Sequence, residues 1–311
     1  MQGPPAGDPK HLTDAMATVP LAVVILTYNE EPNIARCLDS VAGWAGQVFV
    51  LDSFSTDRTV QIARGRSADV HQRAFQGFAD QRNWALAYLP FGFDWVLFLD
   101  ADEWLSEPLK REIADRLSRE GDGPVGYFLP RRHRFMGRWL RFGGLDRTRL
   151  LRLFRRERGR CESRLVDEHF VVDGPTAALR GDLLTEDRKG IGAWIDRHNR
   201  YARLEARELL RQRQVDGTRM RGRLWGSQPE RKRWIRERLW NRLPLFTRPV
   251  LLFVYRYVLR GGFLDGGAGL VYHLLESFWY RLLIDLNYRE LLRSGEIEAE
   301  APPPLRAEAR R

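Results

Sequence analysis

Carboxylate side chains stand at three places where they could bind a nucleotide or a cation. Asp100 and Asp102 flank one alanine directly after an apolar segment, so both can face one pocket. Their combined charge suits a hard divalent cation, Mg²⁺ or Mn²⁺, which would bridge to diphosphate oxygens. Asp52 also ends an apolar segment, and a carboxylate there can accept hydrogen bonds from a ribose or a base edge. The third cluster, Thr27 to Glu30, follows the first apolar segment.

The apolar segments before these clusters are predicted to be buried strands. They are continuously apolar rather than alternating, which is typical of strands covered on both faces of a parallel sheet. The sequence predicts strands at 21–26, 48–51, 68–70 and 94–99, with helices at 32–42, 57–64, 78–89 and 106–120. This alternation predicts an α/β fold with a mainly parallel sheet and right-handed crossovers. Ligands of such sheets bind beyond the carboxyl ends of the strands, where the three clusters stand.

Composition limits the class of protein. The chain has 311 residues and a formal net charge of +10, and almost all of the excess is arginine. An anionic partner or surface is expected from this charge: nucleic acid, anionic lipid or a phosphorylated substrate. Two cysteines are too few for a disulfide scaffold, and the default is a reducing cytosol. We find no secretory signal, no apolar run long enough to span a bilayer, no Gly-rich dinucleotide loop and no P-loop.

Four successive motifs resemble inverting family 2 glycosyltransferases. They are Val23-Val-Ile-Leu-Thr-Tyr-Asn-Glu30, Val50-Leu-Asp-Ser53, Gln81-Arg-Asn-Trp84 and Leu97-Phe-Leu-Asp-Ala-Asp-Glu103. Within that family, the sequence looks most like bacterial enzymes that extend lipopolysaccharide core or lipid-linked exopolysaccharide units. The resemblance covers roughly residues 20–210. It implies a GT-A fold that transfers a sugar from a nucleotide donor, and a UDP-sugar is the expected donor.

The resemblance also assigns roles to individual residues. Thr27, Asn29 and Glu30 would line the nucleotide pocket, and Asp52 would bind uridine. Arg82 would contact the donor diphosphate, Asp100 the donor's sugar or ribose, and Asp102 the metal. Relatives carry V-H-E downstream, where this chain has Val166-Asp167-Glu168, so Glu168 is the expected general base and Asp167 its rival.

The C-terminal third is expected to be helical and to contact a membrane surface. Arginine and tryptophan alternate in 228–242, and 268–286 combines a polar stripe with a broad apolar face. A helical subdomain that packs on the catalytic domain or dimerises is the alternative. The expected organisation is a flexible leader (1–19), a GT-A domain (20–225), an amphipathic membrane-associating region (226–298) and a disordered tail (299–311).

Together these inferences predict a peripheral enzyme on the cytoplasmic side of the bacterial inner membrane. Its acceptor would be a lipid-linked saccharide or lipopolysaccharide core in cell-surface polysaccharide biosynthesis. Transfer to a polyprenyl phosphate is the alternative within enzymes, because a phosphate is already ionised and needs no strong base. A basic nucleic-acid-binding protein is the rival from another class. No specific nucleic acid is expected, because carboxylates converge where a phosphate backbone would lie.

Overall fold

A computed structural model describes residues 18–119, 123–146, 148–162, 168–214 and 243–294. The expected leader, the tail, Asp167 and the Arg/Trp-rich segment 228–242 lie wholly or mostly outside these ranges.

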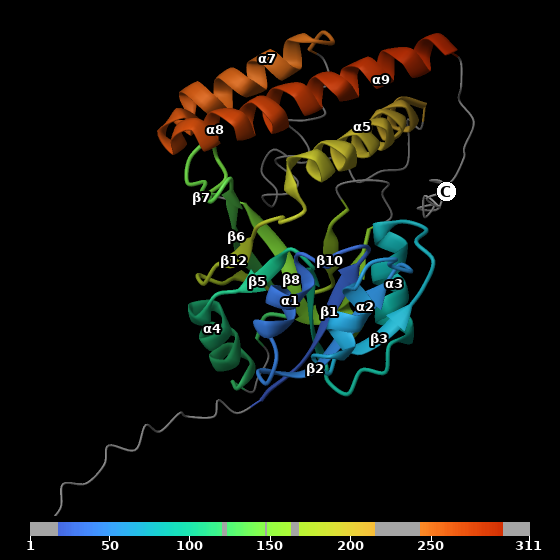
Figure 1. Cartoon of the computed structure of the whole chain (residues 1–311). Coiled ribbons are helices and arrows are strands. Elements are labelled where there is room, and N and C mark those ends of the chain that lie inside the picture. The colour runs from blue at the N-terminus through green and yellow to red at the C-terminus, as the bar shows by residue number, and fades with distance from the viewer. Residues whose placement is uncertain (1–17, 120–122, 147, 163–167, 215–242, 295–311) are drawn as a thin grey trace, which may run out of the picture.

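The expected parallel strands form one half of a curled sheet (Figure 1). Strands β1 (Val19–Thr27), β2 (Ala45–Asp52), β3 (Asp69–Gln72) and β4 (Trp95–Asp100) are parallel and stand in the order β3-β2-β1-β4. The sheet continues through β8 (Arg149–Arg155), antiparallel to β4, then β6 (Gly126–Phe135), β12 (Leu183–Thr185) and β5 (Glu103–Leu105). Short strands β7 (Arg138–Trp139) and β11 (Thr176–Ala178) pair with β6, whereas β9 (Gly159–Cys161) and β10 (Phe170–Val172) pair with each other. The GT-A-type α/β fold is confirmed.

Both faces of the sheet are buried, as continuously apolar strands require. Alternate residues of β1 point to opposite cores, Val23 to one and Val24 to the other. Helices α1 (Ile34–Asp39), α2 (Thr59–Arg64) and α4 (Glu107–Leu117) belong to the first core and α3 (Phe78–Tyr88) to the second. Ser106 caps α4 by accepting from the Leu109 amide.

A helical layer covers the carboxyl edge of the sheet. Helix α5 (Gly190–Gln214) lies between the sheet and α9 (Tyr280–Ser294), as Figure 1 shows. Ala202 of α5 packs with Tyr280 and Ile284 of α9. The layer is completed by α7 (Thr247–Phe253), a π-helical segment η3 (Val254–Leu259), a short 3-10 turn η4 (Gly262–Asp265), α8 (Gly266–His273) and a second π-helical segment η5 (Leu274–Trp279). Within the described residues, no helix is long and apolar enough to cross a membrane.

The helical layer buries polar side chains and exposes apolar ones, the reverse of an ordinary surface helix. Its polar side chains His273, Ser277 and Asp285 are 0%, 0% and 3% exposed, because they face the rest of the protein. Its outer surface carries large apolar side chains that are 41–72% exposed: Val250, Leu251, Val254, Val258, Leu259, Phe263, Leu264, Leu270 and Leu274. We call these nine residues the outer apolar face. The expected apolar face of 268–286 is divided, because Trp279 and Leu283 pack against the α5–α9 core instead.

Candidate active site

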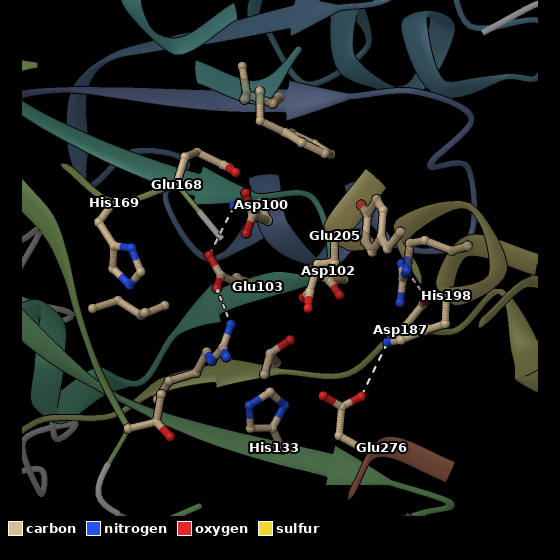
Figure 2. A pocket seen from close by; sticks show the side chains of 18 of the residues that line it. Asp100, Asp102, Glu103, His133, Glu168, His169, Asp187, His198, Glu205 and Glu276 are labelled. Carbon is tan, nitrogen blue, oxygen red and sulfur yellow. Dashed lines mark hydrogen bonds and ion pairs between the residues drawn. The ribbon is translucent and has the colours of Figure 1, made fainter. Parts of the chain in front are cut away.

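A cleft of about 2880 Å³ runs between the carboxyl edge of the sheet and the helical layer. Typical single-ligand pockets are several-fold smaller, so the cleft has room for two substrates. Figure 2 shows Asp100 at the end of β4, Asp102 in the turn that follows and Glu103 at the start of β5, with Glu168 on one side and His198 and Glu276 on the other. The chain topology thus brings the sequence-predicted carboxylates together.

Asp100 is the centre of a network of opposite charges. Arg152 donates to its Oδ2 at 2.5 Å and Arg82 to its Oδ1 at 3.2 Å. Burial alone would raise the pKa of Asp100, but these two guanidinium groups outweigh burial and lower it. Asp100 is therefore an ionised carboxylate committed to two arginines.

Asp102 differs from Asp100 although it stands two residues away. Among the residues that the structure describes, its carboxylate has no hydrogen bond and no ion pair within 4 Å, and it lines the cleft. Burial raises the pKa of Asp102, and the negative charges of Asp100 and Asp187 raise it further, against Arg197 and Arg131. Asp102 is the carboxylate of the pair that is available for a ligand.

Glu168 joins the same network through Arg82. Both side chains are nearly inaccessible, at 9% and 7% exposed, and Arg82 Nη1 donates to Glu168 Oε1. Arg82 thereby connects the predicted base to Asp100, which lies 68 residues earlier in the chain. Its predicted rival, Asp167, lies outside the described residues. Arg82 contacts carboxylates on both sides, and its predicted contact with a diphosphate stays a prediction.

Sequence reasoning missed Arg152 and Glu103. Arg152 is 6% exposed and bridges Asp100 and Glu103, whose own Oε2 accepts from the Asp100 amide at 2.9 Å. Burial raises the pKa of Glu103 to about 7, with Arg152 opposing it. The available signal was an arginine within the apolar segment Leu150-Leu-Arg-Leu-Phe154. A charged residue in a buried strand requires a partner.

Thr27 and Asp52, two residues expected to bind the nucleotide, end β1 and β2. Asp52 is 0% exposed and accepts from Thr27 Oγ1, the Ser55 amide and Gln72 Nε2 at 2.8–3.0 Å. Asn29, with φ of 51°, accepts from the Thr56 amide at 2.8 Å. These contacts tie the loops after β1 and β2 together. Thr27 lines the cleft, whereas Asn29 and Asp52 support it from behind.

The loop after β12 contributes residues that the motifs did not indicate. Lys189 donates to Glu30 Oε1 at 2.5 Å and to the Tyr28 carbonyl oxygen at 3.3 Å. Burial nevertheless raises the pKa of Glu30 to about 7. Arg197 of α5 forms an ion pair with Asp187 at 2.9 Å. The loop therefore adds two ion pairs to the lining of the cleft, Lys189–Glu30 and Arg197–Asp187.

This arrangement, a curled α/β sheet with carboxylates converging at its carboxyl edge, is that of a GT-A-type transferase. Residues 22–183, just over half of the chain, match the family described as glycosyl transferase family 2. The chain belongs to this family and is a glycosyltransferase.

Individual relatives agree with the family. The lipopolysaccharide core biosynthesis glycosyltransferase LpsC of Rhizobium meliloti is 30% identical over 195 residues, which cover 60% of this chain and 71% of LpsC. A glycosyltransferase of Rickettsia typhi is 41% identical over 93 residues, 30% of this chain and 31% of its own length.

The chain also gives matches among solved structures. The mannosyltransferase PcManGT of Pyrobaculum calidifontis, solved with GDP-Man and Mn²⁺, is 17% identical with a TM-score of 0.48, over 91% of this chain and 89% of its own.

Proposed function

We propose that this glycosyltransferase transfers a sugar, with inversion, from a nucleotide-sugar donor to a hydroxyl group of a lipid-linked saccharide or lipopolysaccharide-core acceptor. One observation carries the proposal: a nearly buried carboxylate, Glu168, is held by Arg82 in the cleft that also contains the Asp100–Asp102 pair. A base and a diphosphate site in one cleft are the two parts that such a transfer needs.

A divalent metal ion, Mg²⁺ or Mn²⁺, fits the residues present. Asp102 offers a carboxylate without an ion pair among the described residues, which also contain no group of three or more ligating side chains. Mg²⁺ is commonly held by one or two carboxylates together with substrate phosphates and water, so one free carboxylate suits a metal shared with a diphosphate. When bound, the ion would supply positive charge to the departing diphosphate.

The chain's own residues would position the two substrates. The loops fixed by Thr27, Asn29 and Asp52 would hold the nucleoside, and Glu30 with Lys189 would close the cleft over it. Glu168 would accept the proton of the attacking hydroxyl, and Arg82 would keep its carboxylate oriented toward the acceptor. Asp100, committed to Arg82 and Arg152, would act on the donor mainly by fixing these arginines.

The helical layer supports the proposed acceptor and the proposed place of action. LpsC is named for lipopolysaccharide core biosynthesis, and such acceptors are anchored in a membrane. The outer apolar face presents nine exposed large apolar residues, all on the elements of the helical layer. Contiguous apolar patches of this kind mark protein or membrane contacts. We therefore infer peripheral binding to an anionic membrane surface on the cytoplasmic side of the bacterial inner membrane.

A nucleotide-sugar panel tests the proposal. Thermal unfolding is followed with UDP-, GDP- and other nucleotide-linked sugars, with and without Mn²⁺, in the unmodified chain and in Asp102→Asn. A metal-dependent rise in Tm for one donor is expected, and Asp102→Asn should lose the dependence on metal. Asp69→Asn, an exposed aspartate on β3, is the matched control. An equal response to Mn²⁺ in both aspartate variants would remove Asp102 from the metal site.

A further inference from the structure

The two π-helical segments, η3 and η5, place polar side chains on the wall of the cleft. Arg256 of η3 and Glu276 of η5 line the cleft, whereas Ser277 of η5 is fully buried behind them. Arg256 Nη1 donates to Ser277 Oγ at 3.3 Å and so joins the two segments. π-Helical turns are rare and occur frequently at functional sites. Their pairing here, in the wall that faces the reaction centre, is the first observation.

Arg256 is the second observation, because its charge is not matched. Other charged groups of this wall have partners: Arg248 with Asp285 at 3.7 Å, Arg281 with Glu205 at 3.1 Å, and Glu276 with His198 at 3.3 Å. In the described part of the chain, no carboxylate lies within 4 Å of the Arg256 guanidinium, whose hydrogen-bond partner is a neutral hydroxyl. Burial lowers the pKa of Arg256, which shows the cost of its position. A partly buried cation of this kind is stabilised when an anion binds.

The surroundings of Arg256 combine charge with apolar surface. Leu252 and Val271 line the cleft with it, and Leu251 and Val254 of the same helical stretch lie on the outer apolar face. Glu276, which interacts electrostatically with Arg256, pairs with His198; the adjoining Arg197 interacts electrostatically with Asp102. Arg256 thus lies in the cleft that holds the reaction centre and close to the surface that we assign to the membrane.

We propose that Arg256, held in place by Ser277, forms a subsite for the phosphate group of an amphiphilic, membrane-borne acceptor. The guanidinium would bind the phosphate, Leu252 and Val271 would contact the first part of the apolar chain, and the saccharide would extend along the cleft toward Glu168. This subsite deepens the proposed function and rests on it for the identity of the bound molecule as acceptor.

Binding of farnesyl phosphate to the full chain, without donor, tests the subsite by calorimetry. Arg256→Gln is expected to weaken binding by about 10-fold or more, since a hydrogen bond to a charged group is lost. Farnesol, which lacks the phosphate, should bind weakly and equally to both proteins. Arg260→Gln is the matched control, because Arg260 is four residues away and contacts Tyr255 rather than the cleft. Arg256→Lys, which keeps the charge, should recover part of the affinity.

Three results would overturn the subsite. They are unchanged affinity for farnesyl phosphate in Arg256→Gln, an equal loss for farnesol, and binding of inorganic phosphate as tight as that of farnesyl phosphate. Should Arg256→Gln fail to fold, Ser277→Ala replaces it, with a loss of about 3-fold expected from one neutral hydrogen bond. Because no donor is present, Arg256-dependent binding combined with absent sugar transfer would refute the proposed function and leave the subsite standing.

Discussion

Replacing Glu168 with glutamine separates proton transfer from substrate binding in the cleft. The Glu168 side chain is 9% exposed and pairs with Arg82, whose side chain is 7% exposed. Glutamine has nearly the same size and can still accept a hydrogen bond from Arg82, so the cleft should keep its shape. What glutamine cannot do is accept the proton of the attacking hydroxyl.

Two magnitudes are expected from this geometry. The rate constant kcat should fall by about 100-fold or more, because general base catalysis typically contributes 10²–10⁴-fold. The free energy of unfolding should fall by about 1 kcal/mol, since an ion pair becomes a hydrogen bond from the Arg82 cation to a neutral amide oxygen. Arg82 keeps its second partner, Asp100 at 3.2 Å, so the network is weakened and not abolished. Donor affinity should change little, because a base acts in the transition state.

Single-turnover kinetics and UDP calorimetry measure these effects. Glu157→Gln is the control, because the Glu157 side chain is 81% exposed and takes no part in the cleft. Asp167→Asn is made in parallel, since it tests the rival base. Near-normal kcat in Glu168→Gln with an inactive Asp167→Asn would identify Asp167 as the base. If both retain activity while Asp102→Asn is inactive, the acceptor brings its own ionised oxygen, which would favour a polyprenyl phosphate.

Three further predictions concern stability, pH and membrane binding. Arg152→Met should lower the free energy of unfolding by about 3–5 kcal/mol in urea denaturation, because Asp100 and Glu103 lose the cation between them. A loss below about 1 kcal/mol would show that the network does not depend on this arginine. Burial raises the pKa of Glu30 from 4.5 to about 7, so the folded state holds a proton that the unfolded state releases. The stability that Glu30 contributes is therefore complete below pH 4.5 and is lost as the pH rises through 7. Glu30→Gln should not show this loss, and the same pH profile of stability in both proteins would contradict the prediction. Leu259→Asp changes a side chain that is 72% exposed on the outer apolar face, so it should reduce flotation with anionic liposomes without lowering Tm. Tyr88→Asp, at a residue 69% exposed on α3, is the control and should float normally. Equal flotation of the two variants would argue for the packed-subdomain alternative.

The helical layer changes how the C-terminal region must be tested. Helix α9 packs against α5, and Arg256 and Glu276 line the same cleft as Asp102. Removing the region would therefore expose the α5 core and open the cleft, so loss of membrane binding by a truncated chain would have two causes. Single substitutions on the outer apolar face avoid this ambiguity because those side chains are already exposed.

The sequence by itself determined the central strands and the position of the carboxylate pair. Runs such as Leu21 to Leu26 are apolar at every position, and only a strand covered on both faces buries all of them. Parallel strands place their carboxyl ends at one edge, so Asp52 and Asp100 could be assigned to that edge from their position after the runs. Ser106 was recognisable as a helix cap because capping depends on residues within one turn.

Only the tertiary structure decided which charges meet and which face of the last helices points outward. Arg82 reaches Glu168 across 86 residues, and Arg152 reaches Asp100 across 52, distances over which local sequence patterns carry no information about partners. Helical periodicity shows that His273, Ser277 and the apolar residues lie on different faces, but it is the same whether the polar or the apolar face is buried. Here the polar face is buried because the cleft supplies its partners, as Glu205 does for Arg281 and His198 for Glu276, and the apolar face is therefore left on the outside.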